Sequence, residues 1–420
     1  MLKSRCRPFN QVCRMELSQN LPLSSSVLKG GRLPRRDLLS GIATALMVGI
    51  TGNAADAKSN KKENKDEIKN KSERSNSSGK NDGHEQKNGM PTSSSTNIIK
   101  PKHLVKGDTV GIVAPASPLE NESEIEFTYQ WLKKVGLKYK VGKHLFDSYS
   151  DFAGSDENRI ADFNAMWADP EVKAVMPMRG GNGAARLLNG IDYDLIAKNP
   201  KIIVGYSDIT SFLIAIHQKT GLVTFHGPMM GGFFEGSYTY HNYLKAVMNN
   251  KPIGVVTDKE EKELWNPEGP PTRFVIAKGK ARGRLTGGCM TLIRQLMGTP
   301  YEIDTEGKIL FLEDLDAEPH EIDRMLYQLH LAGKLEKAAG IVVGECTNCN
   351  PGGSGRNSFP LNFSLDRILE HRLSGLGIPV VYGMRFGHSK EKFTIPLGVM
   401  ASIEATDNGV RFKIEESATL

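Results

Sequence analysis

The chain has 420 residues and a formal net charge of +6, from 54 basic and 48 acidic side chains. Residues 1–99 hold 17 of the basic and 9 of the acidic side chains, which leaves 37 basic and 39 acidic in residues 100–420. A nucleic-acid-binding surface needs Lys and Arg clustered on a folded face, so this distribution disfavours nucleic acid as a partner. Five cysteines are too few for a disulfide scaffold. No apolar run reaches the roughly 18 to 20 residues that span a bilayer.

The first 57 residues have the pattern of an export signal. Arg35-Arg36 precedes a mostly apolar stretch over 38–50, and Ala55-Asp56-Ala57 has the small-x-small pattern of a cleavage site. This combination predicts a twin-arginine signal peptide over 1–57 and a periplasmic location, with no stable membrane insertion after cleavage. The alternative is an Arg pair at the start of an ordinary surface helix.

The apolar stretch and its Arg pair lie between a basic, Ser-containing segment and a long polar one. The first 32 residues are long for a signal, so either translation starts later, for example at Met15, or a plastid transit peptide precedes a lumenal signal. Residues 58–99 consist largely of Lys, Asn, Ser, Glu and Gly, with Ile68 as the only large aliphatic residue before Met90. Such a segment buries too little apolar surface to offset its ordering entropy. We therefore predict a disordered linker over 58–99.

From residue 100 onward, short apolar runs alternate with amphipathic segments, which predicts an α/β fold. Apolar residues recur at the i, i+3, i+4, i+7 spacing of a helix after residue 208 and again after residue 321. The predicted strands are Thr109–Ala114, Val172–Met176, Lys201–Val204, Ile309–Leu312, Gly340–Val343 and Pro379–Tyr382; the predicted helices are Ile125–Val135, Asp156–Trp167 with Asp156 as its N-cap, Ile209–Ile216 and Ile322–Leu329.

This part of the chain is predicted to form two α/β domains. A stretch rich in Pro, Lys and Glu lies between Asn250 and Gly279 and is typical of a connection. We therefore expect an N-terminal domain over 100–255, an interdomain linker over 256–279 and a C-terminal domain over 280–420. The last domain is expected to end with a β-hairpin that turns at Asp407-Asn408-Gly409.

Gly205-Tyr206-Ser207-Asp208 lies where a predicted strand is followed by a helix. A serine at such a sharp turn has an exposed hydroxyl, and the first N–H groups of the helix point at the space beside it, where they can hold an oxyanion. Taken alone the motif is weak, because Ser and Asp are also the commonest helix caps.

A serine nucleophile needs an oriented base, and two later residues are candidates. Glu313 follows the strand Ile309–Leu312, at the carboxyl end where α/β folds gather their sites. His388 follows the strand Pro379–Tyr382. The order Ser, Glu, His is one of the known triad orders, yet Glu313 as a surface acid and His388 as a turn residue bonded to backbone remain alternatives.

Five colinear segments between about Lys102 and Glu404 resemble successive signatures of the L,D-carboxypeptidases, also called muramoyltetrapeptide carboxypeptidases. These are serine peptidases that trim murein tetrapeptides. The segments are Gly107–Ser117, Arg179–Leu188, Gly205–Thr210, Phe311–Asp314 with Ile322–Leu326, and Gly387-His388 with Ile395–Gly398.

The resemblance implies a role for each matching residue. Ser207 would be the nucleophile, His388 the general base and then acid, and Glu313 the carboxylate that orients His388. Backbone N–H groups of Asp208 and Gly181 would hold the oxyanion. The resemblance also implies a Rossmann-like N-terminal domain, a C-terminal α/β domain, a catalytic site at their interface and frequent homodimers. The reaction would release a terminal D-alanine from the L-configured centre of a diamino acid, through an acyl-enzyme.

The chain departs from the family pattern at three points. Asn182 stands where an aromatic residue is expected, and Cys289 stands in Gly287-Gly288-Cys289 where Asn is expected. Both departures put the exact peptide substrate in doubt more than the chemistry. The third is the export signal, because members that recycle murein are typically cytoplasmic.

No cofactor and no metal is predicted. Arg186 occupies the place of the third glycine of a dinucleotide loop, and no His-Glu-x-x-His motif is present. Cys346 and Cys349 have metal or redox spacing without a second pair, so they form either a short disulfide or two ordinary thiols. His226, in His226-Gly227-Pro228, is interpreted as a structural residue after a strand.

The favoured hypothesis is thus an exported serine L,D-carboxypeptidase that acts on murein peptides. One alternative is a self-immunity hydrolase of the same superfamily, which cleaves an amide in a peptide-nucleotide antibiotic. The other is a non-catalytic exported solute-binding protein, in which Ser207, Glu313 and His388 need share no geometry.

Overall fold

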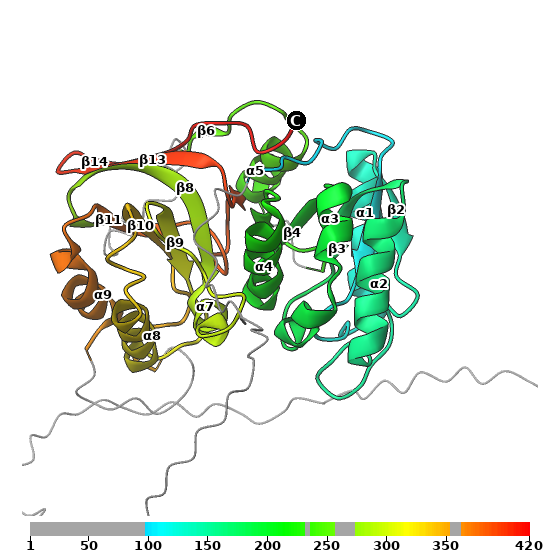
Figure 1. Cartoon of the computed structure of the whole chain (residues 1–420), viewed down its shortest axis with the longest axis horizontal. Coiled ribbons are helices and arrows are strands. Elements are labelled where there is room, and N and C mark those ends of the chain that lie inside the picture. Colours follow the sequence, from blue (N-terminus) through cyan, green and yellow to red (C-terminus); the bar gives the residue numbers. More distant parts are fainter. Residues whose placement is uncertain (1–96, 232–235, 257–273, 353–362) are drawn as a thin grey trace, which may run out of the picture. The chain divides into compact units, whose positions relative to one another are not determined.

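The computed structural model describes residues 97–231, 236–256, 274–352 and 363–420. The predicted signal peptide and nearly all of the predicted 58–99 linker lie outside the described residues. The described part contains two β-sheets with helices packed against them (Figure 1), which confirms the predicted α/β class.

The first sheet has six strands in the order β12-β5-β4-β3-β1-β2. The five strands from β5 to β2 pair in parallel, and β12 pairs antiparallel with β5 at one edge. Parallel strands covered on both faces are continuous apolar runs, and β4 accordingly has no exposed residue. The strands are β1 (Thr109–Val113), β2 (Lys138–Val141), β3 (Val172–Pro177), β4 (Ile202–Gly205), β5 (Phe225–His226) and β12 (Ile395–Pro396).

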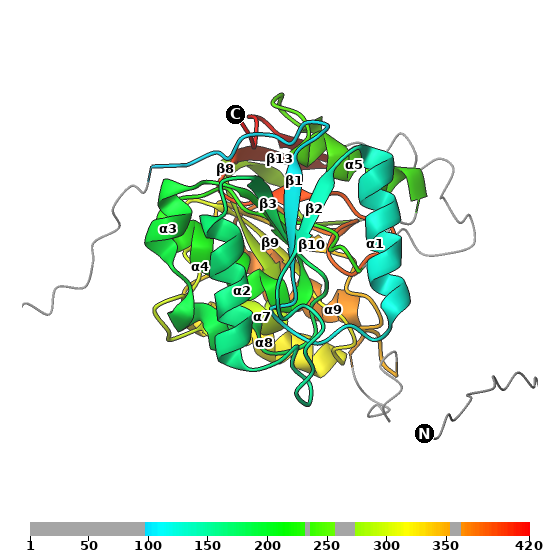
Figure 2. The same ribbon diagram turned by 90° about the vertical axis from the view of Figure 1, so that its right-hand side faces the viewer.

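Helices cover both faces of this sheet, as the turned view in Figure 2 shows for α1 on one side and α2 and α3 on the other. The N-cap of α2 is Ser155, whose hydroxyl accepts a hydrogen bond from the N–H of Asn158, so the predicted Asp156 cap was wrong by one residue. Asp156 instead lies in the first helical turn and binds Arg159 and Arg186. The helices are α1 (Glu122–Val135), α2 (Asp156–Ala168), α3 (Tyr193–Lys198), α4 (Thr210–Thr220) and α5 (Gly236–Val247), with the 3₁₀ turns η1 (Ala184–Gly190) and η2 (Ser207–Ile209).

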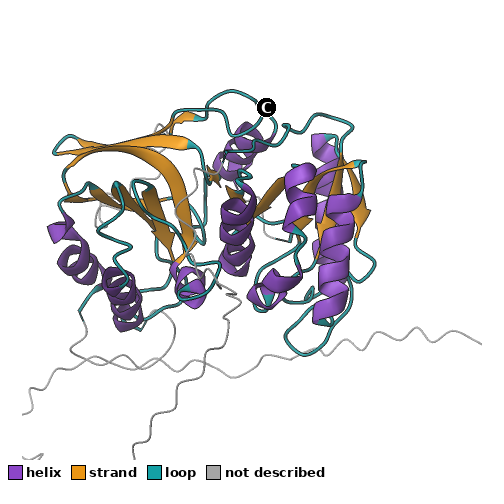
Figure 3. Ribbon diagram, viewed as in Figure 1, coloured by secondary structure: helices purple, strands orange, loops and turns teal. Residues whose placement is uncertain are grey.

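The second sheet has eight strands in the order β6-β14-β13-β8-β9-β10-β11-β7. The run β8-β9-β10-β11 is parallel, and the outer pairs are antiparallel. In Figure 3 the helices α7, α8 and α9 lie on one side of this sheet. Its elements are β6 (Gly254–Val255), β7 (Phe274–Ala277), β8 (Gly279–Cys289), α7 (Met290–Leu296), β9 (Ile309–Glu313), α8 (Pro319–Leu331), β10 (Gly340–Gly344), α9 (Leu365–Leu373), η3 (Ser374–Leu376), β11 (Val380–Met384), β13 (Met400–Thr406) and β14 (Gly409–Ile414).

Strand β7 lies inside the segment predicted as an interdomain linker. Phe274–Ala277 pairs antiparallel with β11, and its four side chains are half-buried. A short run of Phe, Val and Ile is favoured in a strand because such side chains fit a half-buried pleated surface. The rest of the predicted linker, 257–273, lies outside the described residues.

The two sheets are joined by one segment of the C-terminal half. Ile395 pairs with His226 at the edge of the first sheet, and the N–H of Leu397 donates to the carbonyl of Thr224. Three residues later β13 begins in the second sheet, beside β8. The chain from β12 to β13 therefore fixes the half that carries Ser207 against the half that carries Glu313.

Within the described ranges, no helix is both long enough and apolar enough to cross a membrane.

Candidate active site

Ser207 occupies a sharp turn between β4 and the helical segment η2–α4. Its φ is +57°, a left-handed conformation that is uncommon for a residue with a side chain. The turn is closed tightly: a Cβ on Gly205 would lie 2.5 Å from Ile209 Cγ2, which requires glycine at position 205. This strained strand–turn–helix geometry is the one that exposes the hydroxyl of a nucleophilic serine above a sheet.

The glycine-rich loop after β3 packs directly against this turn. A Cβ on Gly180 would lie 3.0 Å from Ser207 Cβ and 3.3 Å from both Ser207 Oγ and the backbone nitrogen of Asp208. Gly181 has φ +110°, and a Cβ there would lie 2.2 Å from Ser117 Oγ. The glycines thus let two backbone segments meet beside the serine hydroxyl. Gly180 and Gly181 line the cavity together with Ser207.

The side chain of Asp208 fastens the serine turn to the glycine-rich loop. Its Oδ2 accepts a hydrogen bond of 2.7 Å from the N–H of Ala184, the first residue of η1. Burial raises the pKa of Asp208 to about 6, although the Ala184 N–H and Arg159 act in the opposite direction. Asp208 therefore has a structural side chain, and its backbone nitrogen would lie 3.3 Å from a Cβ on Gly180.

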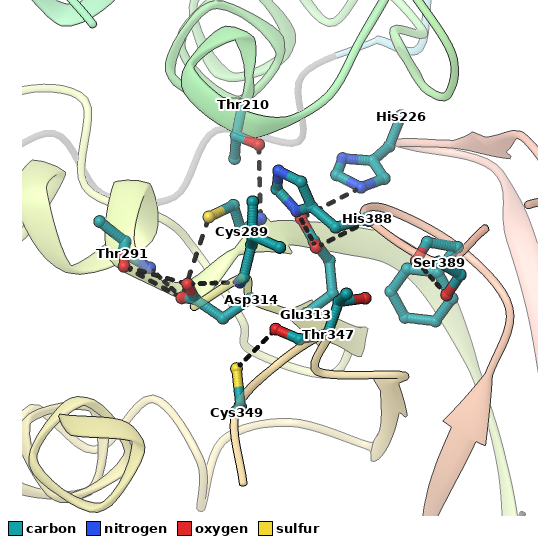
Figure 4. Close-up of polar contacts among 12 residues, drawn as sticks. Thr210, His226, Cys289, Thr291, Glu313, Asp314, Thr347, Cys349, His388 and Ser389 are labelled. Atoms are coloured by element: carbon teal, nitrogen blue, oxygen red, sulfur yellow. Dashed lines mark hydrogen bonds and ion pairs between the residues drawn. The ribbon is translucent and has the colours of Figure 1, made fainter. Parts of the chain in front are cut away.

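Glu313 and His388 come from the second sheet and form a buried acid–base pair (Figure 4). Glu313 is the last residue of β9 and is fully buried, and His388 lies in the turn after β11. The Oε2 atom of Glu313 lies 2.7 Å from His388 Nδ1 and also accepts the backbone N–H of His388 at 3.2 Å. With Nδ1 engaged by the carboxylate, Nε2 is left for proton transfer.

Two features keep the Glu313 carboxylate charged and close to the ring. Burial raises the pKa of Glu313, but the charge and hydrogen bonds of His388 outweigh it, so the net pKa lies below the ordinary value. Gly387 permits the close approach, since a Cβ there would lie 2.2 Å from Glu313 Cδ. The ionised carboxylate is thus able to orient His388 and stabilise an imidazolium.

Ser207 and His388 line the same cavity, which has a volume of about 760 Å³. Tyr206 packs edge-to-face on His388, with ring centroids 4.9 Å apart. No hydrogen bond joins Ser207 Oγ to His388 within the described residues; catalytic hydrogen bonds are often long before substrate binds. The described lining residues are Glu120, Asn121, Ser123, Glu124, Glu126, Phe127, Gln130, Arg179, Gly180, Gly181, Tyr206, Ser207, Met229, Gly231, Leu315 and His388.

Several residues in the cavity or next to the Glu313–His388 pair carry no sequence motif connected with function. Glu120, Glu124 and Glu126 lie at or near the start of α1, and Arg179 Nη1 forms a 2.7 Å ion pair with Glu120. His226 lies beside Glu313, which the interpretation as a plain structural residue did not anticipate. Their positions depend on contacts between segments far apart in the chain, so no local pattern marks them.

The two substitutions against the family pattern lie in different environments. Asn182 is exposed on the glycine-rich loop, and its N–H donates to Ser117 Oγ. Cys289 is buried at the end of β8, where its N–H donates to Thr210 Oγ1 and its Sγ lies 3.9 Å from Asp314 Oδ2. Burial raises the pKa of the Cys289 thiol. Cys289 is therefore a buried packing residue, and it is not among the described residues that line the cavity.

Cys346 and Cys349 are both buried and are free thiols in the structure. Among the described residues, no group of three or more His, Cys, Asp or Glu side chains is arranged to hold a metal ion.

Comparison with known proteins agrees with this architecture. Residues 110–227 match the LD-carboxypeptidase N-terminal domain, and residues 282–403 match the LD-carboxypeptidase C-terminal domain. A probable murein peptide carboxypeptidase of Bacillus subtilis is 42% identical over 308 residues, which cover 73% of this chain and 92% of the relative. The microcin C7 self-immunity protein MccF of Escherichia coli is 29% identical over 73% of this chain and 93% of its own length.

Solved structures give the same result. Microcin C7 self-immunity protein MccF in complex with aspartyl sulfamoyl adenosine matches with a TM-score of 0.67 and 26% identity, over 77% of this chain and all of the other. A muramoyltetrapeptide carboxypeptidase from Oxalobacter formigenes matches with a TM-score of 0.61 and 27% identity, over 73% of this chain and 99% of the other. The fold and the cavity thus define a two-domain α/β carboxypeptidase class. This chain belongs to the LD-carboxypeptidase family.

Proposed function

We propose that this protein is an exported serine L,D-carboxypeptidase that hydrolyses the bond between an L-configured diamino acid centre and the terminal D-alanine of murein tetrapeptides. The observation that carries the proposal is the Glu313–His388 pair, which lies at the same cavity as the strained Ser207. A strained serine, a histidine and a buried carboxylate are the parts that acyl transfer requires.

The proposed reaction has two halves. In the first, His388 Nε2 takes the proton of Ser207 Oγ while Oγ attacks the carbonyl carbon of the diamino acid. Collapse of the tetrahedral intermediate breaks the C–N bond, and His388 returns its proton to the amine of the departing D-alanine. In the second half, His388 deprotonates a water, which attacks the ester carbonyl; collapse of this second intermediate breaks the C–Oγ bond, and His388 returns the proton to Ser207 Oγ. Glu313 keeps the ring oriented throughout and balances its positive charge.

The negative charge of each tetrahedral intermediate needs donors beside Ser207. Asp208 directly follows Ser207, and Gly181 lines the cavity together with Ser207, so the backbone N–H groups of both are the candidates. Backbone N–H groups held by a rigid turn are already oriented before the reaction, so they stabilise the developing oxyanion without reorganisation. These two groups are the proposed oxyanion hole.

The charges around the cavity favour an amphoteric peptide end as substrate. Arg179, which also pairs with Glu120, offers a cation to the terminal carboxylate of D-alanine, and Glu124 and Glu126 of α1 offer anions to the free amine of a diamino acid. The described part of the cavity wall thus has three carboxylates and one guanidinium. An acidic wall of this kind disfavours a negatively charged nucleotide.

The competing function is hydrolysis of a peptide-nucleotide antibiotic, because MccF relatives match this chain in sequence and structure. One feature favours it: Phe127 is 40% exposed at the cavity and offers a ring on which a base could stack. The acidic wall opposes it. Both functions use the same nucleophile and differ only in the part of the substrate beyond the scissile amide.

A substrate comparison separates the two functions. The purified chain lacking residues 1–57 is incubated with a diamino-acid tetrapeptide ending in D-alanine, with the same peptide ending in L-alanine, and with a peptidyl sulfamoyl adenosine. We expect D-alanine release, no L-alanine release and no cleavage of the nucleotide conjugate, each followed by mass spectrometry. Cleavage of the conjugate in preference to the tetrapeptide would assign the immunity function instead.

The export part of the proposal rests on Arg35-Arg36, the apolar stretch over 38–50 and Ala55-Asp56-Ala57. It places the enzyme where it meets wall peptides outside the membrane. The test is expression of the full chain in a bacterium with and without its twin-arginine translocase. We expect a processed periplasmic form only in the first strain, with its new N-terminus at residue 58. An unprocessed cytoplasmic protein in both strains would contradict export.

A further inference from the structure

His226 is a second histidine on the Glu313 carboxylate, and it comes from the opposite sheet. It is the last residue of β5, and its register partner in β4 is Gly205, two residues before Ser207. Its Nε2 lies 3.7 Å from Glu313 Oε1, while His388 occupies Oε2 at 2.7 Å. The two oxygens of one carboxylate therefore face two different histidines, as Figure 4 shows.

The polar atoms on this side of the carboxylate have no other partner. Glu313 Oε1 and both ring nitrogens of His226 are buried and lack a hydrogen bond. The ring is enclosed by Phe311, whose centroid lies 5.4 Å away, and by Phe386 at 6.2 Å. Buried polar atoms of this kind cost free energy unless they pair. A shift of roughly half an ångström would bring Nε2 and Oε1 within hydrogen-bond distance.

The protonation state of His226 suits a donor role. Burial lowers the pKa of His226 to about 4, and although the Glu313 charge opposes this, His388 and Lys392 add to it. The Tyr206 ring also lies against this ring. A neutral imidazole carries one N–H, and Oε1 is the acceptor that faces Nε2. The uncharged Nε2–H tautomer thus satisfies one acceptor without placing a second full charge beside His388.

We propose that His226 is a positioning residue, whose Nε2–H holds Glu313 Oε1 so that Oε2 stays directed at His388. Because β5 is bonded to β4, the same contact ties the carboxylate of the second sheet to the turn that carries Ser207. The N–H of Gly227, which follows His226, donates to the carbonyl of Gly205 at 3.0 Å. His226 therefore sets the distance between the nucleophile and the acid–base pair. This inference rests on the proposed serine mechanism.

The test uses two variants and two backgrounds. His226→Gln retains an N–H donor near the Nε2 position, and His226→Phe removes the donor but retains a ring. We expect His226→Phe to lower kcat about 10- to 100-fold with little change in KM, and His226→Gln to recover most of it. In a Glu313→Gln background the same His226→Phe change should lower kcat only slightly further, because the carboxylate through which His226 acts is already lost. Equal losses in both backgrounds would overturn the inference.

Two further measurements keep this test separate from the proposed function. The first is the rate at which an organofluorophosphonate labels Ser207, which needs no peptide substrate. We expect labelling of the parent and slower labelling of His226→Phe; equal rates would overturn the positioning role, and an unlabelled parent would contradict the serine mechanism and this inference with it. The second is the ¹⁵N chemical shifts of His226 in the parent near pH 7. We expect a neutral Nε2–H ring, and an Nδ1–H tautomer or a charged ring would overturn the inference even if His226→Phe fails to fold.

Discussion

Glu313 holds His388 at two points, because a single carboxylate oxygen lies 2.7 Å from Nδ1 and accepts the backbone N–H of the same residue at 3.2 Å. One contact fixes the tautomer and the other fixes the main chain from which the ring projects. The ring also packs edge-to-face with Tyr206, which precedes Ser207 in the turn after β4. His388 is therefore oriented before a substrate arrives, which is the condition for efficient proton transfer.

Glu313→Gln should keep the shape of this pair and remove its charge. The amide can no longer balance an imidazolium, and its N–H₂ group favours the wrong tautomer of His388. We expect kcat to fall by about 10³- to 10⁴-fold with a small change in KM. The measurement is steady-state D-alanine release, with Glu404→Gln as the matched control, since Glu404 pairs with Lys280 on the surface. A loss below tenfold would contradict the role of the carboxylate.

The backbone of Ser207 should carry measurable strain. Its φ of +57° is unfavourable for any residue with a Cβ. Ser207→Gly and Ser207→Ala both remove the hydroxyl, but only glycine relieves the strain. We expect Ser207→Gly to exceed Ser207→Ala in free energy of unfolding by about 1 kcal/mol, measured by urea denaturation. An equal or lower stability of the glycine variant would show that the turn is not strained.

The close approach at Gly181 should matter for activity. A methyl group there meets Ser117 Oγ at 2.2 Å and displaces the loop beside Ser207. Gly107 is a suitable control because it also has a positive φ, +96°, yet nothing lies within 4 Å of its Cβ position. We expect Gly107→Ala to lose about 1 kcal/mol of stability and Gly181→Ala to lose more because of the clash, while only Gly181→Ala loses at least tenfold in kcat. Full activity of Gly181→Ala would remove this backbone from the site.

Asp208 should make stability depend on pH. Its pKa is raised from 3.8 to about 6, so between these values the folded protein holds a proton that the unfolded chain has lost. Stability from this group is complete below pH 4 and is lost as pH rises through about 6. Asp208→Asn keeps an acceptor for the Ala184 N–H and removes the titration.

We therefore expect the change in the free energy of unfolding from pH 4 to pH 7 to be more favourable in Asp208→Asn than in the parent, by on the order of 2 kcal/mol. Chemical denaturation across this range measures it. Asp314, whose pKa burial and the Glu313 charge also raise to about 6, acts in the same direction in both proteins, and the buried His226, whose pKa is lowered to about 4, acts in the opposite direction in both. Identical pH profiles of parent and variant would mean that Asp208 ionises normally in the folded state.

Much of this fold follows from local sequence patterns. The strands β1, β3, β4, β9, β10 and β11 are short, mostly apolar runs, so their places were predictable within one or two residues. The N-cap at Ser155 was missed by one residue because Asp156 has the same capping chemistry. Strand β7 was missed because it is only four residues long and directly follows a long polar stretch, so its apolar run did not stand out.

The candidate site also has residues that the sequence predicts and residues that it does not. Ser207, Glu313 and His388 stand at strand ends and in motifs, so their candidacy could be seen in the sequence, as could the glycines of the loop. The 3.7 Å approach of His226 to Glu313 could not, because it depends on how β5 of one sheet meets β9 of the other. The acidic wall formed by α1 is likewise a property of packing between segments more than 50 residues apart.

The most direct test of the proposed mechanism is D-alanine release by the chain lacking residues 1–57 and by its Ser207→Ala variant, on one diamino-acid tetrapeptide at the same enzyme concentration. Mass spectrometry follows free D-alanine and the tripeptide. We predict steady release by the parent and a rate at least 10³-fold lower for the variant, whose folding is checked by its unfolding transition. Release by Ser207→Ala at the parent rate would contradict the account.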